Sequence, residues 1–188
     1  MGIGPVLAIV IVIAGCACIY YYNHFVARKN AVDQAYSTID VMLQRRADLV
    51  PNLVAVVSRY LKHESETLTR IAELRSAAAN RSGDLGERVN ADSALGRLVG
   101  NLIIQVENYP ELKADQNCQS LFLSLESMEG QISAARRSYN AAVTNFNNAI
   151  EMFPGNLLAG FFRFGRRELL QATPEERRVP SVKELFKD

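Results

Sequence analysis

An uninterrupted apolar segment at the start of the chain restricts the fold more than any other feature. Residues 3–22, IGPVLAIVIVIAGCACIYYY, are twenty consecutive uncharged residues, most of them apolar. As an α-helix this segment is about 30 Å long, which matches the hydrocarbon core of a bilayer. Three tyrosines at residues 20–22 suit the aromatic belt of a membrane interface, and Arg28 and Lys29 follow closely. The sequence therefore predicts a transmembrane anchor over residues 1–23.

The charges around this anchor predict its orientation. No basic side chain precedes the apolar segment, whereas Arg28 and Lys29 follow it, so the positive-inside rule places the amino terminus outside and the rest of the chain in the cytoplasm. A cleaved signal peptide fits poorly, because the basic start is missing and the apolar run is too long. A lipoprotein anchored at Cys16 is the alternative, since IAGC at 13–16 has the form of a lipobox.

The chain after the anchor has the periodicity of amphipathic helices. Between residues 39 and 78, apolar residues fall into two columns with seven-residue spacing, which predicts one long helix with a buried stripe. Pro51 lies within this pattern without breaking its phase, so it either kinks a continuing helix or begins a new one. The two columns are Ile39, Arg46, Leu53, Tyr60, Thr67 and Leu74, and Leu43, Val50, Val57, Glu64, Ile71 and Ala78.

Turn signals divide the remainder into two further helices. NRSGDLGER at 80–88 ends the first long helix, a second is predicted over 88–108 and ends at NYP, and a third is predicted over 115–152. No alternating pattern predicts a strand, so the sequence indicates an all-α, antiparallel up-and-down bundle over residues 24–168. Residues 169–188 contain two prolines and many charges, which predicts a flexible charged tail.

The composition argues against several classes of function. With 21 basic and 20 acidic residues the net charge is +1, which predicts no nucleic-acid binding. HESET at 63–67 lacks the second histidine of a zinc-protease motif, and no Glu-x-x-His repeat marks a ferritin-like site. The sequence therefore predicts neither a metal nor another cofactor, and no enzymatic activity.

Several motifs resemble the LemA family in sequence and in order. They are RRADLVPNLV at 45–54, YLKHESETL at 60–68, ENYPELKA at 107–114, ARRSYNAAV at 135–143 and FPGNLLAG at 153–160. The resemblance covers residues 24–165 and implies a small bacterial membrane protein with one amino-terminal anchor and a four-helix bundle. It implies no known enzymatic activity. Some members of the family are lipoproteins, and some relatives take part in magnetosome membrane formation.

Two charged residues interrupt the apolar columns of the first helix. Arg46 and Glu64 lie five turns apart, about 27 Å, so they cannot pair with each other. Arg136 or Arg137 is a candidate partner for Glu64, and the candidate partners for Arg46 are Asp48 and Glu107. Three interpretations remain open: a wet groove at the bundle edge, a buried polar pair that sets the helix register, or a ligand or proton-handling site.

The other family-motif residues have structural roles as their simplest interpretation. We expect packing, capping and turn formation, and Asn52 is placed to satisfy backbone groups that Pro51 leaves open. The residues are Pro51, Asn52, Tyr109, Pro110, Arg136, Tyr139, Asn140, Pro154 and Gly155.

Residues 156–169 interleave aromatic and basic side chains. This composition suits a membrane surface, with rings in the interface and arginines on phosphates. The alternative is that the rings cap the bundle's own core. In either case the segment is expected to form a short extra helix, and the candidate residues are Phe161, Phe162, Arg163, Phe164, Arg166 and Arg167.

These features lead to two hypotheses of function. The first is a membrane-anchored helical scaffold or adaptor that presents a cytoplasmic bundle to a protein partner or a membrane patch, with a homo-oligomer as a further alternative. The second is a small-molecule or peptide-binding sensor that uses a polar groove near Arg46 and Glu64.

Overall fold

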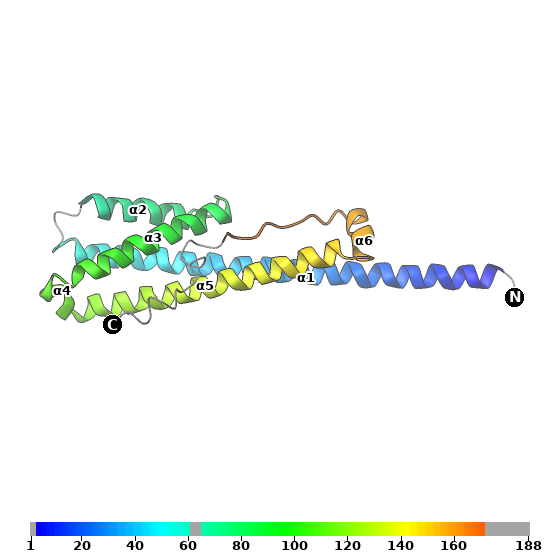
Figure 1. Cartoon of the computed structure of the whole chain (residues 1–188), viewed down its shortest axis with the longest axis horizontal. Helices are drawn as coiled ribbons and strands as arrows, with labels where there is room; N and C mark the ends of the chain where they lie inside the picture. Colours follow the sequence, from blue (N-terminus) through cyan, green and yellow to red (C-terminus); the bar gives the residue numbers. More distant parts are fainter. Residues whose placement is uncertain (1–2, 61–64, 172–188) are drawn as a thin grey trace, which may run out of the picture. The chain divides into compact units, whose positions relative to one another are not determined.

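The protein is all-helical in the residues that the structure describes. The computed structural model describes residues 3–60 and 65–171, and these residues contain helices and no strand (Figure 1). The helices are α1 (Ile3–Val57), α2 (Ser65–Ala79), α3 (Leu85–Val106), α4 (Pro110–Ala114), α5 (Gln116–Glu151) and α6 (Gly155–Phe161). The all-α prediction is therefore confirmed.

The described chain forms two compact units. Residues 3–41 and 132–169 form the first unit, and residues 42–60, 65–131 and 170–171 belong to the second. The helices α1 and α5 contribute to both units, whereas α2, α3 and α4 lie in the second and α6 lies in the first.

The predicted anchor is the exposed beginning of α1. From residue 3 to residue 22 this segment contributes nothing to the buried core, and it is apolar and long enough to cross a membrane. The same helix continues without interruption past residue 23, and its first buried core residue is Phe25. The apolar segment is thus joined directly to the packed part of the first unit.

Pro51 lies inside α1 and does not begin a new helix. The first helix instead ends at Val57, and the next helix begins at Ser65. The prediction of one helix between residues 39 and 78 was therefore wrong. Residues 58–64 lie between the two helices. Because they are seven in number, the seven-residue spacing of the apolar columns continues from α1 into α2 without a shift.

Local capping explains the starts of α3, α4 and α5. The carboxylate of Asp84 accepts a hydrogen bond from the backbone N–H of Glu87 at 3.2 Å, and Asp115 accepts from the backbone N–H of Asn117 at 2.8 Å. Pro110 occupies the first turn of α4, where its missing N–H has no cost. The predicted ends of the second and third helices agree with α3 and α5 to within three residues.

Four helices contribute to an apolar core in the second unit. Three residues come from α1, one from α2, three from α3 and one from α5, and the side chains are nearly inaccessible to water. Within this unit α2 and α3 lie side by side (Figure 1). The core residues are Val50, Leu53, Val57, Ile71, Leu95, Val99, Leu102 and Leu125.

Candidate functional site

A charged cluster of the second unit surrounds the buried Arg46. Its Nη1 atom lies 3.1 Å from Oδ2 of Asp92 on α3 and 2.6 Å from Oε2 of Glu129 on α5. The side chains of Arg46 and Asp92 are 2 % and 3 % exposed, whereas that of Glu129 is 56 % exposed. The cluster therefore joins three helices through one buried pair and one carboxylate that reaches water.

Gly96 makes room for this guanidinium. A Cβ atom at residue 96 would lie 2.6 Å from Nη2 of Arg46 and 2.9 Å from Oε2 of Glu129. Glycine in a helix interior is less favourable than alanine by about 1 kcal/mol. Its presence in α3 is explained by the space that the side chain of Arg46 occupies.

The structure supports the buried-pair interpretation for Arg46 and corrects its predicted partners. Asp48 is exposed and accepts from Nε2 of Gln44 at 2.9 Å, and Glu107 is also exposed. Neither is the partner seen for Arg46, which is Asp92 with Glu129. Glu64 lies outside the described residues.

Arg88 and Asp92 were not identified as candidates from the sequence, and the structure buries both. Arg88 is 1 % exposed, and its Nε donates to the carbonyl of Ala78 in the last turn of α2 at 3.1 Å. The signal was available, because residues 88, 92, 95 and 99 follow helical spacing and so share the buried face of α3.

Pro51 has a structural consequence that reaches α2. A proline has no N–H, so the carbonyl four residues earlier, that of Ala47, has no backbone donor from residue 51. Arg75 of α2 donates from Nε to this carbonyl at 2.6 Å. The freed acceptor is thus satisfied by Arg75, whereas Asn52, the residue expected to do so, is exposed.

The chemistry of the second unit is that of structural polar contacts. Among residues 3–60 and 65–171, no group of three His, Cys, Asp or Glu side chains could hold a metal ion. Cys118 is buried, and burial together with the nearby carboxylate of Asp115 raises the pKa of its thiol. A raised pKa leaves less thiolate at neutral pH, which makes Cys118 a poor nucleophile.

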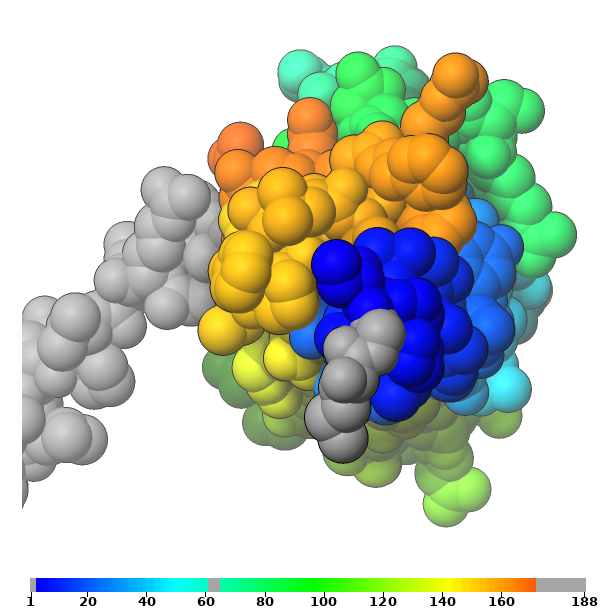
Figure 2. Space-filling model, turned by 90° about the vertical axis from the view of Figure 1, so that its right-hand side faces the viewer, coloured from blue at the N-terminus to red at the C-terminus, as the bar shows by residue number. Residues whose placement is uncertain are grey.

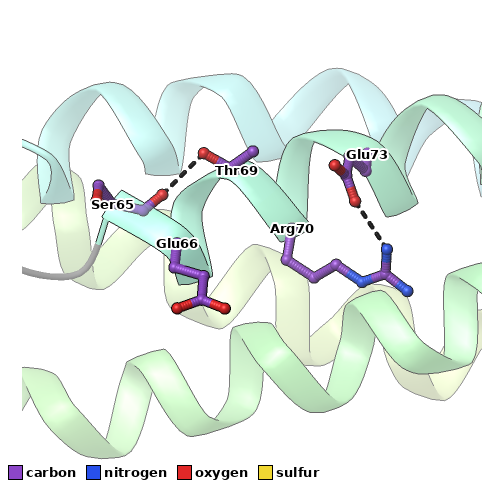
Figure 3. A pocket seen from close by; sticks show the side chains of 5 residues that line it. All are labelled: Ser65, Glu66, Thr69, Arg70 and Glu73. Atoms are coloured by element: carbon purple, nitrogen blue, oxygen red, sulfur yellow. Dashed lines mark hydrogen bonds and ion pairs between the residues drawn. The ribbon is translucent and has the colours of Figure 1, made fainter.

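A shallow groove lies on the outer side of α2 (Figure 3). All its lining residues come from this one helix and all are exposed, and Arg70 and Glu73 pair with each other at 2.7 Å. Arg46 is not among the described residues that line the groove. Its lining residues are Ser65, Glu66, Thr69, Arg70 and Glu73.

In the first unit, the interleaved aromatic and basic segment is divided between core and surface. The ring of Phe162 lies 5.0 Å from that of Tyr22, and the ring of Phe164 lies 5.4 Å from that of Phe25 and 6.3 Å from that of Phe146. Phe161, in contrast, is exposed. The core-cap interpretation therefore fits Phe164, whereas Phe162 packs against the exposed Tyr22 and Phe161 remains at the surface.

Two arginines of this segment lie close to acidic side chains. Arg166 pairs with Glu151 at 2.7 Å, and Arg167 lies 3.7 Å from Asp33. Asn147 of α5, which is buried, donates to the carbonyl of Arg167 at 2.9 Å and accepts from its N–H at 3.0 Å. Arg163 is exposed and has a φ of 58°.

The remaining motif residues occupy the following positions. Tyr109 is exposed and precedes α4, which Pro110 begins. Tyr139 is buried and donates from its hydroxyl to the carbonyl of Glu168 at 3.4 Å, Asn140 is partly buried beside it, and Arg136 is buried. Pro154 precedes α6, and Gly155 begins it as a buried residue, where a Cβ would lie 2.6 Å from the carbonyl of Ala149.

The model of the LemA family matches residues 35–183 of the chain. The magnetosome protein MamQ 2 of Paramagnetospirillum magneticum is 28 % identical over 205 residues, which cover 93 % of this chain and 75 % of that protein. Protein LemA of Metamycoplasma hominis is 29 % identical over 163 residues, covering 87 % of this chain and 74 % of its own. The magnetosome protein MamQ of Magnetospirillum gryphiswaldense is 26 % identical, covering 81 % and 65 %.

The motifs, the helical fold and the family match agree with one another. The matched region includes α2 to α6 and most of the packed part of α1. The chain belongs to the LemA family.

Proposed function

We propose that the protein is a membrane-anchored, non-enzymatic helical scaffold or adaptor that presents its body to a protein partner. The observation that carries the proposal is the continuity of α1. Its exposed apolar part, residues 3–22, has the length of a membrane span, and the same helix supplies Phe25, Val32 and Ile39 to the buried core. A helix that both anchors and packs holds the first unit next to the bilayer.

The finer architecture is part of the proposal. The anchor comprises residues 1–23, the body residues 24–168 and the tail residues 169–188. The body is an antiparallel four-helix bundle, in which α1, α2, α3 and α5 are the four helices. This arrangement is supported by their joint contribution to an apolar core in the second unit.

The orientation places the amino terminus outside and the body in the cytoplasm. It rests on Arg28 and Lys29, which are exposed and follow the span closely. A lipoprotein cleaved before Cys16 would lose most of the apolar part of α1, so an intact amino-terminal peptide in mass spectra of the purified protein distinguishes the two anchors.

The candidate surface for the protein partner lies on the second unit. Ile104 of α3 and Leu123 of α5 are large apolar side chains that are mostly exposed. Removing an aliphatic side chain from water lowers the free energy, so exposed positions of this kind favour contact with another protein.

The test is photo-cross-linking in living cells with a photoreactive residue at Ile104 or Leu123, read by mass spectrometry. Matched probes at Arg70 and Glu73 of α2 serve as controls, because these residues are exposed but already pair with each other. The proposal expects one recurrent protein partner at Ile104 or Leu123 and little at the controls. Capture of only further copies of this chain would replace the adaptor by a homo-oligomer, and equal capture at all four positions would contradict a specific surface.

A further inference from the structure

Four large apolar side chains remain exposed where α5 turns into α6. Met152 and Leu157 are 67 % exposed, Phe161 is 79 % exposed and Phe153 is 81 % exposed. Leu157 and Phe161 are four residues apart and so lie on one face of α6. Soluble proteins rarely leave so many large apolar residues uncovered within one short stretch.

Contacts within the first unit fix this corner beside the end of the predicted span. Phe162 directly follows α6, and its ring packs against Tyr22 at 5.0 Å. The buried Gly155, at the other end of α6, approaches Phe25 so closely that a Cβ would lie 3.3 Å from its ring. Both ends of α6 are therefore held against residues 22–25 of α1.

The place along α1 where the turn between α5 and α6 is held determines the depth of this turn relative to a bilayer. A helix over residues 3–22 is about 30 Å long, which equals the hydrocarbon thickness, so Tyr22 falls at its edge. Figure 2 looks toward the amino-terminal end of α1 and shows the end of α5 and α6 next to it.

We infer that Met152, Phe153, Leu157 and Phe161 insert into the boundary between headgroups and acyl chains of the leaflet that α1 leaves. The inference rests on the proposed function, because it requires residues 3–22 to span the bilayer. Arg166 and Arg167 already have the acidic partners Glu151 and Asp33. Apolar burial therefore supplies the contact, and insertion occurs in zwitterionic as well as anionic membranes.

The absence of tryptophan from the sequence allows a direct test. F161W and L157W each introduce a single indole among the four exposed apolar side chains, which we call the patch. Each full-length variant is reconstituted in phosphatidylcholine vesicles. V41W is the matched control: Val41 is an exposed apolar residue of the same unit, and it lies 19 residues beyond Tyr22, about 28 Å along α1.

The measurement is tryptophan emission, with quenching by lipids that carry a nitroxide near the headgroup end of the acyl chain. The inference expects blue-shifted emission from F161W and L157W and quenching several-fold stronger than that of V41W. Co-flotation of each variant with the vesicles is measured in the same samples, so that loss of the anchor is seen separately from loss of the patch.

Three results would overturn the inference. Red emission without lipid quenching from F161W and L157W in protein that floats with the vesicles would show that the patch stays in water. Blue-shifted emission without lipid quenching would show that protein and not lipid covers these side chains. A chain that does not float with the vesicles would remove the anchor, and the proposed function would fail together with the inference.

Discussion

Arg75 of α2 donates to the carbonyl of Ala47 in α1 at 2.6 Å. This acceptor is available because Pro51, four residues later, has no N–H to offer it. Pro51 inside the long helix α1 is thus coupled to the docking of α2. This coupling gives a structural explanation for the proline in the motif.

The coupling can be measured with a double-mutant cycle. Arg75→Met should lower the free energy of unfolding by about 1.5–3 kcal/mol, because a carbonyl loses a charged donor. Pro51→Ala alone should change it little or raise it slightly. In the Pro51→Ala background the loss from Arg75→Met should shrink, since residue 51 then supplies a backbone donor. Urea unfolding of the four proteins in detergent checks this, and equal losses in both backgrounds would contradict the coupling.

The buried pair of Arg46 and Asp92 should matter far more than an exposed one. Arg46→Met is expected to cost about 3–5 kcal/mol, because it leaves a buried carboxylate without its compensating charge from residue 46. Replacing both residues, R46M with D92L, should recover most of that loss. The control is Arg70→Met, which breaks the exposed pair with Glu73 and should cost about 0–1 kcal/mol. Similar losses for R46M and R70M would refute the role of burial.

Gly96 and Gly100 provide a matched comparison within α3. A Cβ at residue 100 meets nothing within 4 Å, whereas one at residue 96 meets Arg46 and Glu129. Gly100→Ala should therefore stabilise by about 0.5–1 kcal/mol through helix propensity. In the native chain, Gly96→Ala should stabilise less than Gly100→Ala or destabilise. Once R46M has removed the guanidinium, the two substitutions should change the free energy of unfolding by the same amount. If G96A behaves like G100A in the native chain, Gly96 does not hold space for Arg46.

Asn147 should hold residues 162–169 to α5. Its side chain makes two hydrogen bonds with the backbone of Arg167, at 2.9 and 3.0 Å, and it is buried. Asn147→Ala removes both, so the amide of Arg167 should exchange its hydrogen with solvent faster, by hydrogen exchange and mass spectrometry. Asn148→Ala is the control, because Asn148 is exposed next to it. Unchanged exchange in N147A would show that other contacts hold the segment.

The thiol of Cys118 should titrate at a pH that depends on Asp115. Burial first and the negative charge of Asp115 second raise the pKa of Cys118, so its thiolate forms only as the pH rises above that of an exposed thiol. Because the folded state disfavours the thiolate, this group destabilises the fold as the pH rises through the unfolded pKa. Asp115→Asn removes the charge but keeps an oxygen that can cap α5, and it should lower the pKa.

Thiolate absorbance against pH, in a chain with C16A and C18A, measures this shift. Glu111→Gln is the control, because Glu111 is an exposed acid in the neighbouring α4 that does not affect Cys118. An identical titration for D115N and the native chain would mean that Asp115 has no influence on the thiol.

The sequence predicts the helices well where turn signals mark their ends. NRSGDLGER at 80–88, where α3 begins, and NYP after α3 are such signals, and the bounds agree to within three residues. The break after Val57 was missed for a geometric reason. Residues 58–64 are seven in number, so the apolar columns continue in phase on α2 although the helix does not.

The candidate site was predictable in part. Arg46 stands out because it interrupts an apolar column, and the structure buries it. Its partner was not predictable, since the sequence does not state which helix faces which. Asp92 lies 46 residues away, and only the packing of α1 against α3 within the second unit brings the two together. The same holds for Arg75, whose acceptor appears only when α2 lies beside α1.

The direct passage of α1 from the apolar segment into the core has a mechanical consequence. With no linker between Tyr22 and Phe25, any change in the tilt of residues 3–22 turns the packed part of the first unit by the same angle. Helices adjust their tilt to bilayer thickness. Because α6 is attached to α1 at residues 22–25, a thinner or thicker membrane would, with residues 3–22 spanning it as proposed, press the apolar face of α6 into the lipid or lift it out.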